Sequence, residues 1–324
     1  MRFRTPICDL LDIDYPILQG GMAWTSTAEL AAAVSEAGAL GIIGAGSMTP
    51  DHLREEIAKA RELTDRPFGV NLVLLNNPYT RELVNIVQDE RIPVVTTGAG
   101  NPGPYIVGMK EHGIKVLPVT ASVALAKRLE RAGADAIIAE GMEAGGHVGE
   151  LTTFVLVPQL AEAVKVPVVA AGGIANGAGM LAAFTLGAQG VQLGTRFICA
   201  TECQVHDRVK QSIVEAKDRD TTITGYSTGH PVRIIKNRLA RELGKLDQQN
   251  KGEELEREGQ GKLQLAMSKG DVEWGSVMAG QSSAMVCKIE SAKDIVMSLV
   301  EEAEQTLARL ETLGEWARNE SRHG

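Results

Sequence analysis

The stretch from Val168 to Thr195 decides the fold of this 324-residue chain. It opens with the apolar run Val168–Ala171, followed directly by two glycines, and it closes with a second run, Val191–Gly194. Between them Gly177–Leu186 has the composition of a helix, and no residue of the whole stretch is charged. Short continuous apolar runs are typical of parallel strands covered on both faces, whereas a lipid-facing helix would carry fewer glycines. We therefore predict a buried strand, a helix and a second buried strand.

Six further apolar runs precede this stretch, and their starts are mostly about 20 to 30 residues apart, the length of one strand–helix unit. The helical segments between them end repeatedly on glycine, at Gly38, Gly113, Gly133 and Gly187, because glycine readily adopts the left-handed conformation that stops a helix. Eight such units favour an α/β fold of the (β/α)8 TIM barrel type over a doubly wound sheet. The six runs are Pro16–Gln19, Leu40–Gly44, Phe68–Leu72, Pro93–Thr97, Lys115–Val119 and Ala136–Glu140.

The composition changes after the eighth run. Residues 201–275 are largely polar and charged, and they are too many for a plain loop inside a compact domain. We predict a mostly helical insertion over the barrel mouth, with one helix at Arg233–Leu246. A closing helix is expected at Ala292–Leu310, with a frayed tail beyond it. The predicted domains are a barrel of residues 1–200 and 276–324 and an inserted lid or substrate subdomain of residues 201–275.

The overall composition excludes several classes of protein. The formal net charge is −8, whereas nucleic-acid binding needs clustered basic charge, so we expect no nucleic-acid partner. The uncharged stretch carries too many glycines for a membrane span, so we expect no membrane association either. Four cysteines are too few for a disulfide scaffold in a chain of this length. We expect a cytoplasmic protein, and a homodimer because that symmetry is the commonest.

Glycines gather where the predicted strands end, which is the face on which barrel enzymes place their active sites. The strongest signals are Gly172-Gly173 after the seventh strand and Gly194-Thr195 after the eighth. Barrels frequently bind phosphate in these two loops through backbone N–H groups. Glycine also serves tight turns alone, but its accumulation at one face favours a flat or phosphorylated ligand that rests on the backbone.

Two other motifs have weaker support. The run Gly98–Gly103 matches the glycine spacing of the dinucleotide fingerprint, but prolines interrupt it and the next strand lacks a carboxylate at its end. Cys199, Cys203 and His206 carry metal-ligating atoms, but a fourth ligand is not evident and the spacing is not a standard one. We interpret both motifs as structural and predict no metal site.

His147 is the titratable residue of greatest interest. It lies between Gly146 and Val148-Gly149, in a glycine-rich loop after the sixth predicted strand. A histidine in such a loop is either exposed to solvent without a role or positioned to donate a proton or a hydrogen bond near neutral pH. Its place at the active face favours the second interpretation.

Several of these segments resemble the nitronate monooxygenase and enoyl-reductase superfamily of FMN barrels, over about residues 5 to 300. Asp220–Ile223, Gly229–Arg233 with Lys236-Asn237, and Gly275–Gln281 further resemble its branch of bacterial FMN-dependent enoyl-(acyl-carrier-protein) reductases, type II. The segments that carry the family resemblance are Gln19–Ala23, Gly69–Asn71, Thr96–Gly100, Glu140–His147, Ala170–Ile174 and Gly194–Phe197.

The resemblance implies an activity and a set of site residues. Hydride would pass by a ping-pong route from NADH or NADPH, through N5 of FMN, to the β-carbon of a trans-2-enoyl thioester on acyl carrier protein. His147 would hydrogen-bond the thioester carbonyl or supply the α-proton, and Gly172, Gly173, Gly194 and Thr195 would hold the FMN phosphate. The resemblance also implies help from a monovalent cation, whose ligands the sequence does not identify. The residues expected to line the flavin are Gly21, Met22, Ala23, Gly44, Asn71, Glu140, Gly145 and Gln192.

Two rival functions remain at this point. A nitronate monooxygenase, which oxidises alkyl nitronates with oxygen, shares the scaffold and the histidine loop, so only the stretches after residue 220 favour the reductase. A non-catalytic barrel that binds flavin or a phosphorylated metabolite is disfavoured by His147 and by the complete set of glycines. The sequence leaves open the choice of NADH or NADPH and the length of the acyl chain.

Overall fold

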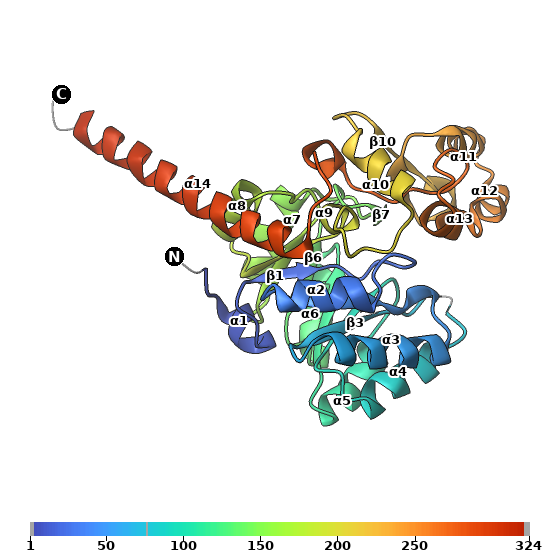
Figure 1. Ribbon diagram of the computed structural model, residues 1–324, viewed down its shortest axis with the longest axis horizontal. Helices are drawn as coiled ribbons and strands as arrows, with labels where there is room; N and C mark the ends of the chain where they lie inside the picture. The colour runs from blue at the N-terminus through green and yellow to red at the C-terminus, as the bar shows by residue number, and fades with distance from the viewer. Residues whose placement is uncertain (1–2, 76, 321–324) are drawn as a thin grey trace.

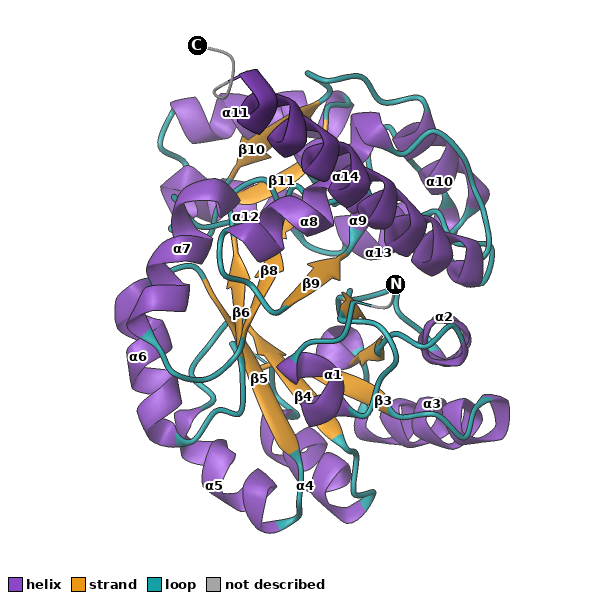
Figure 2. Ribbon diagram, turned by 90° about the vertical axis from the view of Figure 1, so that its left-hand side faces the viewer, coloured by secondary structure: helices purple, strands orange, loops and turns teal. Residues whose placement is uncertain are grey.

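Eight parallel strands form a barrel in the computed structural model, which describes residues 3–75 and 77–320 (Figure 2). Hydrogen-bonded neighbours follow the order β1-β9-β8-β6-β5-β4-β3-β2, and a parallel bridge between Leu18 and Leu40 brings β2 back beside β1. The predicted TIM barrel is confirmed, with β8 as its seventh strand and β9 as its eighth. The barrel strands are β1 Ile17–Gln19, β2 Gly41–Gly44, β3 Phe68–Val73, β4 Val94–Gly98, β5 Lys115–Thr120, β6 Ile137–Glu140, β8 Val168–Ala171 and β9 Gly190–Leu193.

Helices alternate with the barrel strands and cover the outside of the sheet (Figure 2). The four glycines predicted to stop a helix all have left-handed backbone: φ is 87° at Gly38, 79° at Gly113, 105° at Gly133 and 98° at Gly187. This conformation turns the chain out of the helix and toward the next strand. The helices of this layer are α2 Ala28–Glu36, α3 Pro50–Leu63, α4 Thr80–Asp89, α5 Gly103–Glu111, α6 Val123–Ala132, α7 Thr153–Ala163 and α8 Gly177–Thr185, with a 3-10 turn at Ala45–Ser47.

The hydrophobic core has two layers. Alternate strand positions such as Leu18 and Ile138 fill the barrel interior, while a larger cluster fills the space between the strands and the outer helices. Helix α1, Pro6–Leu11, contributes Ile7 to the inner cluster. Ile7 also lies against Gly190, the first residue of β9, so α1 covers the N-terminal ends of the strands. A ligand site is therefore expected at the opposite, C-terminal ends.

The insertion contains a small sheet as well as helices. Strands β10, Thr221–Thr224, and β11, Val232–Ile235, are antiparallel. Strand β11 also pairs with β7, Gly146–His147, which belongs to the loop after β6. The insertion is thereby hydrogen-bonded to the histidine loop. Its other elements are α10 Asp207–Val214, a 3-10 turn at Tyr226–Thr228, α11 Arg238–Gln248, α12 Gly252–Gly259 and α13 Lys262–Lys269.

The helix predicted at Arg233–Leu246 is wrong at its start, because Arg233 lies in β11 and the helix begins at Arg238. Three of the four residues of β11 are β-branched, which favours a strand. Asn237 then starts α11 as its N-cap, since its side-chain oxygen accepts the N–H of Ala240 at 2.8 Å.

The closing helix α14, Ala292–Glu320, is longer than predicted, and it continues through most of the tail expected to be frayed (Figure 1). The last four residues of that tail lie outside the described part of the chain. Helix α14 packs against α8, α2 and the short helix α9, Thr195–Ile198. Glu302 of α14 accepts the N–H of Gly177 at 2.9 Å, which caps α8. No helix within the described ranges is long and apolar enough to span a membrane.

A buried ion pair joins α9 to the segment before α14. Arg196 donates to Glu290, both side chains are less than one-tenth exposed, and Lys288 contacts the same carboxylate at 2.6 Å. We expect Glu290→Ala to lower the free energy of unfolding by about 3–5 kcal/mol, because the Arg196 charge stays buried without its partner. Glu273→Ala, which breaks an exposed pair with Arg238, should cost at most about 1 kcal/mol. Urea denaturation measures both, and equal losses would contradict the role of burial.

Candidate active site

The ends of the first three strands and of β9 approach one another closely. A Cβ atom added at Gly21 would lie 2.1 Å from the Cβ of Asn71, and one added at Gly44 would lie 2.5 Å from the carbonyl oxygen of Met22. A Cβ at Gly194 would lie 3.5 Å from the sulfur of Met22. The structure therefore brings together five of the residues predicted to bind the cofactor. Any larger residue would clash at Gly21 and Gly44, so glycine is required at these two positions.

Polar contacts that the sequence did not reveal hold these strand ends in place. Gln19 donates to the hydroxyl of Ser26 at 2.9 Å, and this hydroxyl accepts the N–H of Met22 at 3.0 Å. Asn71 donates to the hydroxyl of Thr96 at 2.9 Å. Gln19 was the one sequence signal of these contacts, because a buried amide in an otherwise apolar strand must find hydrogen-bond partners.

Gln192 and Ala23 lie next to other glycines at the ends of β1 and β2. A Cβ added at Gly20 would lie 3.3 Å from the Cγ of Gln192, and the Gln192 side chain is buried. Its amide has no hydrogen-bond partner among the described residues, so it is available to a ligand. Ala23 lies in a turn farther out, where its Cβ would be 3.7 Å from one added at Gly46.

The loops after β8 and β9 form a cradle of backbone N–H groups. Gly172 and Gly173 have φ values of 92° and 72°, and a Cβ at Gly172 would lie 2.8 Å from the carbonyl oxygen of Gly141. Within the described ranges, the N–H groups of Gly172, Gly173 and Gly194 make no hydrogen bond. Unpartnered N–H groups in successive left-handed residues suit an anion, so this cradle fits the phosphate of FMN.

Glu143 and Thr153 support the cradle from outside. Glu143 accepts the N–H of Thr153 at 2.9 Å at the start of α7, and the Thr153 hydroxyl lies 2.9 Å from the carbonyl oxygen of Gly172. A carboxylate is favourable at a helix N-terminus because it satisfies N–H groups that lack partners. These contacts link the loop after β6 to the phosphate cradle, and nothing in the sequence pattern indicated that Thr153 takes part.

The segment that returns from the insertion completes the wall. Gly280 donates its N–H to the hydroxyl of Thr195 at 2.9 Å. A Cβ at Gly145 would lie 2.6 Å from the carbonyl carbon of Ala279. Gly145 and Thr195 thus contact the same returning segment, which fixes their positions relative to each other.

Glu140 ends β6 at the barrel mouth, where part of its surface remains accessible. Burial raises the pKa of its carboxyl from an ordinary 4.5 to about 7. No hydrogen bond or ion pair reaches it from the described residues. A carboxyl that is partly protonated near neutral pH can donate a hydrogen bond as well as accept one.

The raised pKa of Glu140 predicts a pH dependence of stability in flavin-free protein. Between about pH 4.5 and 7 the folded state holds a proton that the unfolded state has lost, so the free energy of unfolding falls as pH rises through this window. Glu140→Gln should abolish the fall and stabilise the protein by about 1–3 kcal/mol at pH 8. Urea denaturation at pH 5 and pH 8 measures the effect. Glu150→Gln, at an exposed neighbour, is the control, and identical behaviour of the two variants would contradict the prediction.

His147 lies at the junction of the barrel and the insertion. Gly146, its neighbour in β7, has a φ of 79°. In the pairing of β7 with β11, His147 is opposite Val232, and Val148 donates to the carbonyl of Pro231 at 3.0 Å. Partial burial lowers the pKa of His147, and the nearby His230 lowers it further. The neutral form of the imidazole is therefore favoured more than it is in a freely exposed histidine.

Arg233 holds this loop from the insertion side. Its Nε and Nη2 donate to the carbonyl oxygen of Met142 at 3.2 and 3.0 Å, and its Nη1 donates to the hydroxyl of Thr221 at 3.1 Å. The guanidinium is buried. The sequence did not assign this role to Arg233, because the pairing of β7 with β11 joins residues far apart in the chain.

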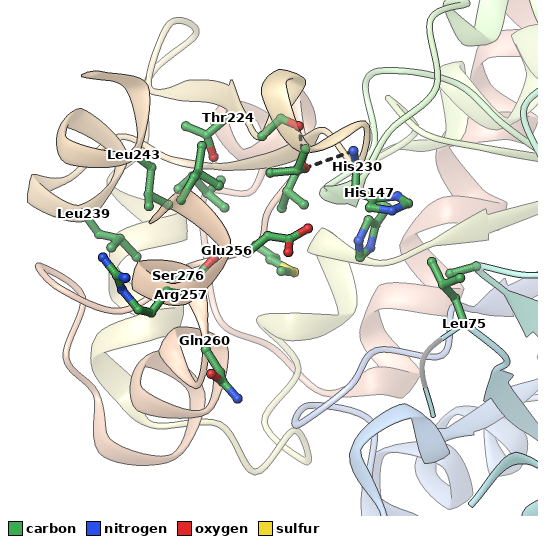
Figure 3. A pocket seen from close by; sticks show the side chains of 18 of the residues that line it. Leu75, His147, Thr224, His230, Leu239, Leu243, Glu256, Arg257, Gln260 and Ser276 are labelled. Carbon is green, nitrogen blue, oxygen red and sulfur yellow. Dashed lines mark hydrogen bonds between the residues drawn. The ribbon is translucent and has the colours of Figure 1, made fainter. Parts of the chain in front are cut away.

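A cavity of about 660 Å³ extends from His147 into the insertion (Figure 3). Val73, Leu75 and Ala99 of the barrel line one side of it. The insertion, together with Ser276 and Met278 of the segment that follows it, supplies the rest of the wall, which is largely apolar. Its members are Thr224, Gly225, Thr228, His230, Val232, Ile234, Leu239, Leu243, Glu253, Leu255, Glu256, Arg257, Gly259, Gln260, Ser276 and Met278.

Of the two motifs interpreted as structural, the glycine run reaches the cavity wall through Ala99, whereas Cys199, Cys203 and His206 do not line the cavity. Cys199 and Cys203 are buried free thiols, and burial raises their pKa values to about 12 and about 11. His206 accepts the N–H of Arg208 at 3.2 Å at the start of α10. Gly103 begins α5.

Comparison with known proteins places this site in a family. The chain matches the family model described as nitronate monooxygenase over residues 4–82 and 76–302. It belongs to the nitronate monooxygenase family. A probable nitronate monooxygenase from Staphylococcus saprophyticus is 34% identical over 95% of this chain and 100% of its own length. Membership of this family confirms the resemblance seen in the sequence and identifies the chain as a flavin oxidoreductase.

Two solved structures are similar to this chain over nearly its whole length. The structure of FabK from Thermotoga maritima is 51% identical with a TM-score of 0.93, and the match covers 96% of this chain and 99% of that one. A nitroalkane oxidase from Streptomyces ansochromogenes is 30% identical with a TM-score of 0.82, over 94% of this chain and 99% of that one. Coverage this high includes the insertion as well as the barrel.

Proposed function

We propose that this protein is an FMN-dependent enoyl-(acyl-carrier-protein) reductase, which reduces trans-2-enoyl thioesters with NADH or NADPH. The observation that carries the proposal is the position of His147 on the wall of a largely apolar cavity of about 660 Å³, most of whose lining comes from the insertion. The similarity to FabK, an enoyl-(acyl-carrier-protein) reductase of type II, extends over that insertion and supports the same assignment.

The residues present fit FMN. Unpartnered N–H groups of Gly172, Gly173 and Gly194 would receive the phosphate, and Asn71 and Gln192 would face the flavin with their amides. When bound, FMN would supply the hydride chemistry. The protein's contribution is to orient the ring system and to exclude water.

His147 would act on the thioester. Negative charge develops on the thioester oxygen as the double bond is reduced, and an imidazole N–H placed at this oxygen stabilises that charge. The same ring can deliver the proton that the α-carbon requires. The lowered pKa of His147 makes its protonated form a stronger acid for that step.

The apolar wall of the cavity would receive the acyl chain. Leu239, Leu243 and Leu255 form a separate hydrophobic cluster in the insertion, and all three line the cavity. Each methylene buried there would contribute about 0.8 kcal/mol to binding. A small nitroalkane has no chain to fill this space, so the cavity favours an acyl substrate delivered by acyl carrier protein.

Nitronate oxidation is the second candidate, because the family model and the Staphylococcus saprophyticus relative carry that name. One comparison tests the proposal against it. The purified protein should contain FMN and should oxidise NADH or NADPH when a crotonyl thioester is added. Consumption of oxygen with nitroalkanes, without thioester turnover, would instead assign the protein to the monooxygenases.

A further inference from the structure

His230 lines the same cavity as His147 and lies just before β11 of the small sheet. Strand β11 places Val232 opposite His147, and the ladder extends to Pro231, whose carbonyl accepts the N–H of Val148. His230 lies in the irregular segment two residues before β11, next to this pairing. Figure 3 shows the two imidazoles at one end of the cavity.

The backbone that carries His230 is tightly held, whereas its ring is not. Asp247 accepts the N–H groups of Gly225, Tyr226 and Ser227 at 2.9, 3.1 and 2.7 Å, which fixes the turn before His230. The His230 N–H donates to the hydroxyl of Thr228 at 3.1 Å. The imidazole itself is exposed and makes no hydrogen bond with any described residue. The ring is therefore placed accurately and remains available to exchange protons with solvent.

The two histidines also interact electrostatically. His230 contributes to the lowered pKa of His147, so protonation of one ring disfavours protonation of the other. The other ionisable side chains that line the cavity are Glu253, Glu256 and Arg257 of α12, and none of them hydrogen-bonds to either ring. The pair of imidazoles therefore favours a state with one added proton over a state with two. Such a pair is suited to transfer a proton from one ring to the other.

The inference rests on the proposed function, because enoyl reduction consumes a proton in every turnover. The carbon–carbon double bond is replaced by two C–H bonds, one formed with a hydride at the β-carbon and one with a proton at the α-carbon. We propose that His230 is a proton-relay residue that reprotonates His147. In this scheme His147 gives its ring proton to the α-carbon, His230 transfers a proton to the vacated nitrogen of His147, and water reprotonates His230.

The test compares holoenzyme variants at a surface position where substitution should not disturb folding. His230→Gln should lower kcat for a crotonyl thioester by about tenfold or more, a part of the usual acid–base contribution, while KM changes less than twofold. The solvent deuterium isotope effect on kcat should increase. His112→Gln, the same substitution at a histidine that caps α5, should leave kcat unchanged.

Two further measurements exclude a merely structural role. Added imidazole should restore part of the kcat lost in His230→Ala, and NMR titration should show a higher pKa for His147 in His230→Gln than in the wild type. The relay would be overturned by an unchanged kcat and isotope effect in His230→Gln, or by a loss of kcat in His230→Ala that imidazole does not rescue. In either case, thioester turnover by the wild type would still uphold the proposed function. Absence of thioester turnover in the wild type would overturn both.

Discussion

Replacing His147 with alanine should lower kcat for a crotonyl thioester by about 10²- to 10⁴-fold, the usual contribution of a positioned acid–base group. FMN should remain bound, because His147 lies on β7 beside the insertion and not in the N–H cradle formed by Gly172, Gly173 and Gly194. Steady-state kinetics and the flavin absorbance of the purified variant measure the two effects separately.

His147→Gln separates the two roles assigned to the ring. Glutamine still donates a hydrogen bond to the thioester oxygen, but it transfers no proton. A glutamine variant about tenfold or more faster than the alanine variant would show that the hydrogen bond carries much of the effect. Equal rates for the two variants would identify proton delivery as the main role. Turnover in His147→Ala at the wild-type rate would contradict both.

Gly194→Asp should produce a protein that largely loses its flavin. The backbone at Gly194 has a φ of −108°, and an added Cβ would meet only the sulfur of Met22 at an ordinary 3.5 Å. A side chain is therefore tolerated, but a carboxylate would stand beside the phosphate. Repulsion of about 2–4 kcal/mol at such a partly screened site corresponds to a rise of about 30- to 1,000-fold in the Kd for FMN. Flavin fluorescence titration measures this constant.

Gly194→Asn is the matched control, because asparagine has nearly the shape of aspartate without its charge. It should weaken FMN binding much less than Gly194→Asp. The ratio between the two variants should shrink as salt is added, since exposed charges are screened. Equal Kd values for the two variants at low salt would show that the phosphate does not lie at the end of β9.

The sequence predicted the elements whose signals are local. Continuous apolar runs predicted all eight barrel strands to within one residue at each end. Gly38 and its three counterparts adopt the conformation that a helix stop requires. The strand ends meet because barrel geometry forces the C-terminal ends of parallel strands onto one face. Gly21, Met22, Asn71 and Gly194 could therefore be grouped without any knowledge of their contacts.

The parts that the sequence did not predict depend on contacts between distant segments. Strand β7 has two residues, and it exists because β11, about 85 positions later, supplies its partner. Arg233 was placed in a helix for the same reason, although the β-branched residues beside it were a usable signal. Thr153 supports the phosphate cradle because the fold brings the start of α7 against Gly172, where the Thr153 hydroxyl donates to the Gly172 carbonyl.

The most direct test of the account is a single competition between the two activities of this family. The purified holoenzyme is supplied with NADH or NADPH and a crotonyl thioester, and in parallel with nitroethane and oxygen, at equal enzyme concentration. We expect NAD(P)H oxidation matched by formation of the saturated butyryl thioester, at a rate well above any nitroalkane-dependent oxygen consumption. Oxygen consumption with the nitroalkane and no saturated thioester would contradict the account.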